Sequence, residues 1–161
     1  MSIIDYALQM EKDGEEYYRE LAAKASDAGV KKVFEFLADA EAEHYETFLQ
    51  MKENQPVTRS DDKHISKIKN LFSEMKESGV QGTVDQDTLD AYIKARDVEK
   101  VSQETYEQKA EEISDSEQKE MCLMIAGEEA KHYLILDNLI EFLQHPTTWV
   151  EDAEWRHMDD Y

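Results

Sequence analysis

The sequence predicts an all-α protein: a bundle of four long helices made of two antiparallel hairpins. Pro occurs only twice and Gly five times in 161 residues, while Glu, Lys, Ala, Leu and Met are common, a composition that favours helix over sheet. The second observation is an internal repeat at a constant offset of 88 residues, which gives the chain two similar halves. We expect one bundle domain over residues 1–145 and a docking tail over residues 146–161.

Two amphipathic stretches predict the first hairpin. The first begins at Ser2, where Ser2-x-x-Asp5 resembles a capping box, and runs to about Lys24 with apolar residues at three- and four-residue steps. The Ser-Asp-Ala-Gly sequence at residues 26–29 is typical of a turn. The second helix should end before Pro56, because the residue preceding a proline disfavours helical backbone.

The second hairpin is expected from the same kinds of signal. Its first helix follows a cap at Thr83 or Asp85. Its second helix starts after Ser114-x-x-Glu117, which resembles a capping box, and runs to about Gln144. Residues equidistant from the bend of each hairpin should lie at the same height along the two helices.

A long connection over residues 52–86 separates the hairpins. It contains an amphipathic stretch from Ile65 to Met75, which predicts a short helix that Gly79 and Gly82 end. A crossover of this length leaves the relative direction of the two hairpins open. The tail, with Trp149 and Trp155, is expected to form a short docked helix or a lid.

The repeat preserves the same residue at each of seven positions, without insertion or deletion. They are Ala7, Glu11, Tyr18, Ala22, Glu41, His44 and Tyr45 in the first half, and Ala95, Glu99, Tyr106, Ala110, Glu129, His132 and Tyr133 in the second. Each half therefore supplies one Glu followed by Glu-x-x-His. The midpoint between the two glutamates falls in the predicted turn of each half, so both glutamates lie about 22 Å from the bend. Residues three apart share one helix face, so all six side chains can converge in one layer.

A buried layer of this kind predicts a metal site. Burying an unpaired carboxylate is strongly unfavourable, whereas two divalent cations balance four glutamates if both histidines bind as neutral imidazole. Oxygen-rich ligation with one nitrogen per ion suits iron, with manganese as the alternative. An exposed acidic face, or a repeat that has lost its metal, would be the competing interpretation.

The remaining composition limits the partners and the location. The net charge of −20 disfavours binding to nucleic acid or to an anionic membrane surface. The lone Cys122 aligns with Phe34 across the repeat, so it is expected to be a small core residue of a protein in the reducing cytoplasm. No apolar run approaches the length of a membrane span.

The motif around Glu11, followed by Glu-x-x-His-Tyr, resembles the rubrerythrin-type branch of the ferritin-like superfamily. The resemblance covers all four long helices. It implies a di-iron site in which Glu41 and Glu129 bridge the ions, while Glu11, Glu99, His44 and His132 bind terminally. Tyr18 and Tyr106 would then donate hydrogen bonds to these carboxylates; ordinary core packing is the alternative.

Three departures from the family pattern affect the expected chemistry. No Cys-rich rubredoxin domain is present, Arg96 stands where rubrerythrins have a further carboxylate, and Ala42 replaces the Met of haem-binding bacterioferritins, so haem is not expected. Peroxidase chemistry that uses a ligand switch is therefore doubtful.

The resemblance favours a di-iron oxidoreductase, expected to be a homodimer. It would reduce hydrogen peroxide or dioxygen with electrons from an external donor, a rubredoxin-like protein or a flavoprotein. The alternatives are a ferroxidase or iron-storage protein of ferritin type, and a metal-free helical interaction module.

Overall fold

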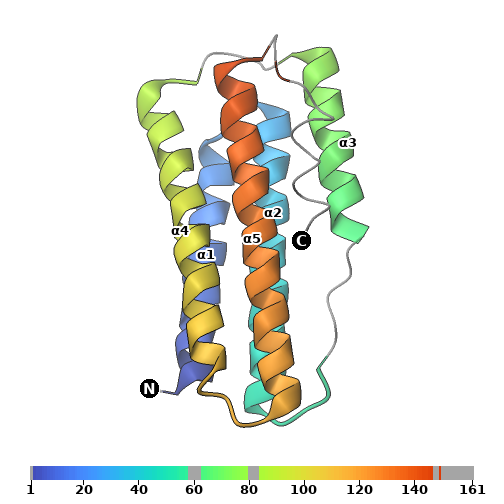
Figure 1. Ribbon diagram of the computed structural model, residues 1–161. Helices are drawn as coiled ribbons and strands as arrows, with labels where there is room; N and C mark the ends of the chain where they lie inside the picture. The colour runs from blue at the N-terminus through green and yellow to red at the C-terminus, as the bar shows by residue number, and fades with distance from the viewer. Residues whose placement is uncertain (1, 58–62, 80–83, 147–148, 150–161) are drawn as a thin grey trace. The chain divides into compact units, whose positions relative to one another are not determined.

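The computed structural model describes residues 2–57, 63–79, 84–146 and 149, without the side chains of residues 63–65. These residues form five helices and no strand (Figure 1). In chain order the helices are α1 (Ile3–Lys24), α2 (Ala28–Lys52), α3 (Lys63–Ser78), α4 (Gln86–Ala110) and α5 (Ser116–Gln144). None of them, over the part of the chain described, is both long and apolar enough to cross a membrane. The chain divides into two compact units, Met1–His64 and Ile65–Tyr161.

The helices of the first unit begin at side-chain caps. The Ser2 hydroxyl accepts a hydrogen bond from the Asp5 backbone N–H at 3.1 Å, which confirms the predicted start of α1. Asp27 caps α2 by accepting from the Val30 N–H at 3.0 Å. The predicted turn was therefore too long: residues 28–29 already belong to the first turn of α2, because the Asp27 carboxylate satisfies the Val30 N–H, which has no partner within the helix.

Helices α1 and α2 pack as an antiparallel pair, as predicted (Figure 1). Ion pairs join Lys52 Nζ to Asp5 Oδ1 at 2.7 Å and Arg19 Nη2 to Asp39 Oδ1 at 2.8 Å. The residue numbers in each pair add up to nearly the same value, which is the mark of an antiparallel register. α2 ends at Lys52, before Pro56, also as predicted.

Helices α4 and α5 form the corresponding pair in the second unit. Asp85 caps α4 by accepting from the Thr88 N–H at 2.8 Å. Asp115 caps α5 by accepting from the Gln118 N–H at 2.9 Å. The cap predicted at Ser114 was wrong by one residue. The correct cap extends the repeat, since Asp115 is the counterpart of Asp27 and carries the negative charge that a helix N-terminus favours.

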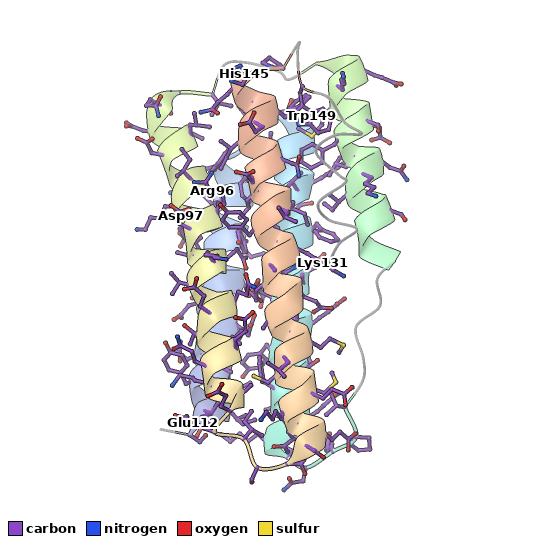
Figure 2. The ribbon with its side chains drawn as sticks, in the orientation of Figure 1. Arg96, Asp97, Glu112, Lys131, His145 and Trp149 are labelled. Atoms are coloured by element: carbon purple, nitrogen blue, oxygen red, sulfur yellow. The ribbon has the colours of Figure 1, made fainter. Side chains whose placement is uncertain are left out.

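Trp149 joins α3 to α5 within the second unit (Figure 2). Its ring is buried and stacks on Phe72 of α3 at 5.7 Å between ring centres, and it meets Phe142 of α5 edge-on at 5.5 Å. Lys76 donates a hydrogen bond to the Trp149 carbonyl at 2.7 Å. α3 confirms the predicted short helix, and Gly79 follows its end with a φ of 74°. The predicted tail helix and Trp155 lie outside the described residues.

Cys122 is fully buried on α5, where its Sγ lies 3.6 Å from the carbonyl oxygen of Tyr106. Its repeat counterpart Phe34 is equally buried and stacks on Tyr18, with 6.2 Å between the ring centres. Both positions are therefore part of the core. Burial raises the pKa of the Cys122 thiol to about 11. The structure thus supports the prediction of a small core residue.

We expect Cys122 to resist thiol reagents in the folded protein at pH 8, because a thiol with this pKa is almost entirely protonated and its sulfur is buried. Absorbance of the anion released from Ellman's reagent measures the reaction. The same protein in guanidinium chloride should react completely within minutes. Rapid labelling of the native protein would contradict the buried position.

Candidate metal centre

The first unit brings three predicted ligands together. Glu11 lies on α1 and Glu41 and His44 on α2, with exposed fractions of 1%, 4% and 2%. Their candidate ligand atoms lie within 4.8 Å of one another. His44 Nδ1 is 3.5 Å from Glu11 Oε2, a separation expected for two ligands that each bind one ion at about 2.1 Å. We call Glu11, Glu41 and His44 the first half-site.

The second unit repeats this arrangement with Glu99 on α4 and Glu129 and His132 on α5. All three side chains are buried, and their candidate ligand atoms also lie within 4.8 Å of one another. His132 Nδ1 is 3.7 Å from Glu99 Oε1. In both units the nitrogen that faces the glutamate is Nδ1, which makes it the candidate metal-binding atom. These three residues are the second half-site.

The local structure explains why the repeat produces this geometry. Glu41 and His44 are three residues apart on one helix face, as are Glu129 and His132. The connections between the paired helices are short, and the predicted midpoints fall within them. Each upstream glutamate therefore meets its Glu-x-x-His motif at the same height.

The donor set of each half-site fits one divalent transition-metal ion. Two ionised carboxylates and one neutral imidazole carry a charge of −2, which a divalent cation neutralises. Without such a cation, two carboxylates buried side by side are strongly unfavourable. Two oxygen donors and one imidazole nitrogen suit iron or manganese, and no thiolate is present to select a softer metal.

The two predicted tyrosines are buried about two helical turns from the upstream glutamates on the same helices. Tyr18 on α1 and Tyr106 on α4 have exposed fractions of 4% and 1%, and each follows its unit's upstream glutamate by seven residues. Seven residues is close to two helical turns, so each tyrosine lies on the same helix face as that glutamate. Hydrogen bonds from the two hydroxyls to the carboxylates remain a prediction.

Gly14 lies against the candidate ligand Glu41, a contact that only the structure makes clear. A Cβ atom at this position would lie 3.1 Å from Glu41 Oε2, closer than ordinary van der Waals contact. The absence of a side chain therefore lets the Glu41 carboxylate approach α1 closely. The repeat held a weak signal for this asymmetry, because the counterpart of Gly14 is Ser102, which has a side chain and is buried.

Arg96, which stands where rubrerythrins have a further carboxylate, binds residues of α5. Its Nη1 forms an ion pair with Asp137 Oδ1 at 2.9 Å, and its guanidinium carbon lies 5.6 Å from the centre of the Tyr133 ring. Arg96 stands out in the sequence, whereas Asp137 does not. The antiparallel register was the available signal, since it places these two residues at similar heights on α4 and α5.

A helical chain with a buried Glu, Glu and His set on each of two hairpins defines a class: helical proteins with a carboxylate-type metal centre. The family model described as Rubrerythrin matches residues 2–140, and the chain therefore belongs to the rubrerythrin family. This membership confirms the all-α, ferritin-like fold class and implies a di-iron centre. Neither the curated proteins nor the solved structures give a match.

Proposed function

We propose that this protein is a di-iron redox protein that reduces hydrogen peroxide or dioxygen with electrons from an external donor. In this proposal Glu11, Glu41 and His44 of the first half-site and Glu99, Glu129 and His132 of the second would hold two iron ions. The observation that carries it is the presence of a −2 half-site, buried and with the same donor set, in each unit of a rubrerythrin-family chain. When bound, the iron pair supplies two electrons and Lewis acidity.

The chain's own residues would hold the ions and exclude water. Glu11, Glu99, His44 and His132 would each offer a ligand atom, and their burial keeps the carboxylates in a medium where charge interactions are strong. Neutral imidazole keeps its lone pair available on Nδ1. Hydroxyl donation from Tyr18 and Tyr106 would orient the carboxylates as the charge of the centre changes.

In our proposal the electrons come from a separate donor protein. Cys122 is the single cysteine and is buried, so no dithiol pair can deliver electrons to the centre. A rubredoxin-like protein or a flavoprotein would act as the donor. We also propose a homodimer in the cytoplasm as the working form.

The decisive experiment loads the protein anaerobically with Fe(II) and then adds peroxide or oxygen in separate stopped-flow runs. We expect one oxidation of the loaded iron, followed by repeated turnover only when a rubredoxin-like or flavin donor is supplied. Faster oxidation by peroxide supports peroxide removal, whereas faster oxidation by oxygen supports oxidase or ferroxidase work. Sustained NADH-linked turnover by the isolated chain, or no oxidation at all, would contradict the proposal.

Size-exclusion chromatography separates this function from iron storage. A dimer of the 18.8 kDa chain elutes far below a ferritin-type cage of many subunits. Elution as a large cage, with oxygen as the faster oxidant, would replace the proposed function by ferroxidase and storage.

Gly14→Ala should weaken metal binding while stabilising the metal-free protein. Alanine is favoured over glycine within a helix by up to about 1 kcal/mol, but its methyl group would displace the Glu41 carboxylate. Calorimetric metal titration and thermal melts of the apo protein measure the two effects. Gly127→Ala is the matched control, because a Cβ there meets no atom within 4 Å. Equal metal affinity in both variants would show that the close approach of Glu41 to α1 is unimportant.

A further inference from the structure

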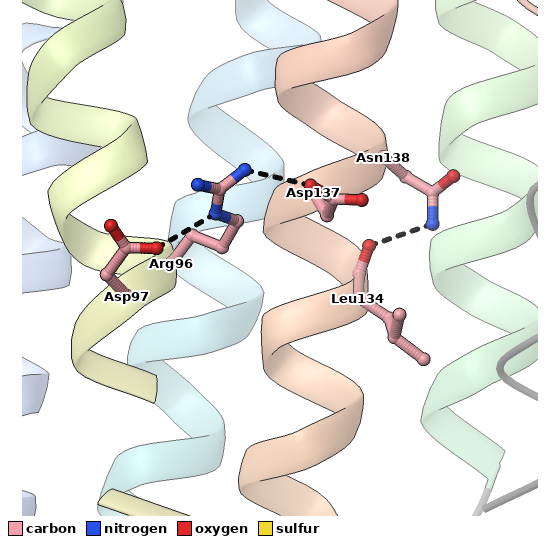
Figure 3. Close-up of polar contacts among 5 residues, drawn as sticks. All are labelled: Arg96, Asp97, Leu134, Asp137 and Asn138. Atoms are coloured by element: carbon pink, nitrogen blue, oxygen red, sulfur yellow. Dashed lines mark hydrogen bonds and ion pairs between the residues drawn. The ribbon is translucent and has the colours of Figure 1, made fainter. Parts of the chain in front are cut away.

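Three residues beside the second half-site form a contact cluster that we call the Arg96 clamp: Arg96 on α4, and Tyr133 and Asp137 on α5. Figure 3 shows the Arg96 guanidinium between two carboxylates, with Nη1 2.9 Å from Asp137 Oδ1 and Nε 3.1 Å from Asp97 Oδ1. On α5, the Asn138 amide donates to the Leu134 carbonyl in the same view. The Tyr133 ring lies against the guanidinium, within cation–π distance.

The clamp is close to the metal ligands along both helices. Arg96 precedes Glu99 by three residues, about one helical turn, and Tyr133 directly follows His132. Arg96 lies on α4 far from the α4–α5 bend that Glu112 marks (Figure 2). The clamp therefore ties the two helices together at the level next to the second half-site.

The contacts of Arg96 are better shielded than the other interhelical ion pairs described. Its side chain is 23% exposed and that of Asp137 is 38% exposed, against 45% and 67% for Arg19 and Asp39. Burial lowers the pKa of Arg96, whereas its hydrogen bonds to the Asp137 and Asp97 carboxylates raise it. The hydrogen bonds together outweigh burial, so the pKa of Arg96 lies above its ordinary value. Partial burial limits screening by salt.

Among the described residues, the first half-site has no charged pair at the positions equivalent to the clamp. Its residues at the positions of Arg96 and Asp137 are Leu8 and Leu49, although Tyr45 is the counterpart of Tyr133. The described ion pairs of lysine and arginine that join α1 to α2 involve Asp5 and Arg19, which lie six and eight residues from Glu11. The half-sites thus share their ligands but differ in how their helices are held.

We propose that the Arg96 clamp positions Glu99 and His132 so that the second half-site takes the first metal ion. This inference rests on the proposed function, because it assumes that both half-sites bind metal. Ligands already held in place lose less conformational freedom on binding, and partners that orient ligands typically change metal affinity by about 10–100-fold. Arg96 and Asp137 are positioning residues and do not touch the metal.

Anaerobic titration with Co(II), followed by its visible absorption bands, tests which half-site fills first. His44→Ala removes a ligand of the first half-site and should leave the first binding step within about twofold of wild type. His132→Ala should weaken that step by about tenfold or more. Equal losses in the two variants, or a larger loss for His44→Ala, would overturn the inference.

The clamp itself is tested in the His44→Ala protein. Arg96→Leu with Asp137→Leu introduces the residues that the first unit carries at these positions, and we expect about tenfold weaker binding and altered absorption bands. Arg19→Leu with Asp39→Leu is the matched control and should change neither. Asp137→Asn keeps the side-chain shape and should also weaken binding, whereas Asp137→Glu should restore most of it.

The possible outcomes distinguish failure of the proposed function from failure of the Arg96 clamp. Wild-type protein that binds no cobalt overturns the proposed function itself. Binding of two ions with an affinity that the Leu pair and Asp137→Asn leave unchanged overturns only the clamp. Circular dichroism melts of each apo variant establish that the proteins compared are folded.

Discussion

Iron-loaded wild-type protein should contain about two ions per chain, and Glu41→Ala or Glu129→Ala should lose both. The family resemblance implies that these two carboxylates would bridge the ions, so removing either one would take a ligand from both ions and leave the two positive charges poorly balanced. Elemental analysis of protein purified under iron-replete conditions measures the stoichiometry. This is the largest effect we expect from any single substitution.

Glu46→Ala serves as the control, because Glu46 is exposed on the same helix as Glu41. It removes one carboxylate from the acidic surface and should leave the metal content unchanged. Zero or one ion in the replete wild type would rule out the di-metal centre. Loss of metal in the Glu46 variant would show that general acidity, and not the buried ligands, holds the ions.

Removing the metal should lower the melting temperature by roughly 10–20 °C. A ligand that binds only the native state stabilises it by about 2.7 kcal/mol at a free concentration 100 times its dissociation constant, so two ions contribute about 5 kcal/mol. For a chain of this size, each kcal/mol moves the melting temperature by about 2–4 °C. Calorimetry with and without chelator measures the shift.

Apolar replacements provide the matched test of its cause. Changing the four ligand glutamates to methionine and the two histidines to leucine should give a protein that melts above the apo wild type and no longer responds to chelator. The reason is that the buried charges, rather than the fold, destabilise the apo form. A wild-type melting curve indifferent to chelator would instead indicate that the carboxylates are solvated.

Periodicity and spacing in the sequence were sufficient to predict the long helices and both antiparallel pairs. The start of α1 was correct and that of α4 was one of the two predicted alternatives, because Ser2 and Asp85 act locally on the N–H groups that follow them. The cap of α5 was misassigned to Ser114 because Ser and Asp are both good caps, and two adjacent candidates cannot be separated by type alone. The single-domain assignment of residues 1–145, the tyrosine hydroxyl partners and the homodimer stay predictions.

The six candidate ligands were found from the sequence because their positions depend on helical period and on distance from a bend. Both quantities can be counted along the chain, and the same spacing occurs in both halves of the repeat. The structure brings Glu11, Glu41 and His44 together in the first unit, and Glu99, Glu129 and His132 in the second. Their residue types then predict the kind of metal.

Contacts between residues distant in the chain were decided only by the tertiary structure. The stacking of Trp149 on Phe72, the approach of Glu41 to Gly14 and the ion pair of Arg96 with Asp137 each depend on which rotamer fits the space left by its neighbours. The sequence by itself thus determined the helices and their register, and it predicted the candidate ligands that they carry. The packing that distinguishes one half-site from the other follows no period along the chain, and so it required the folded structure.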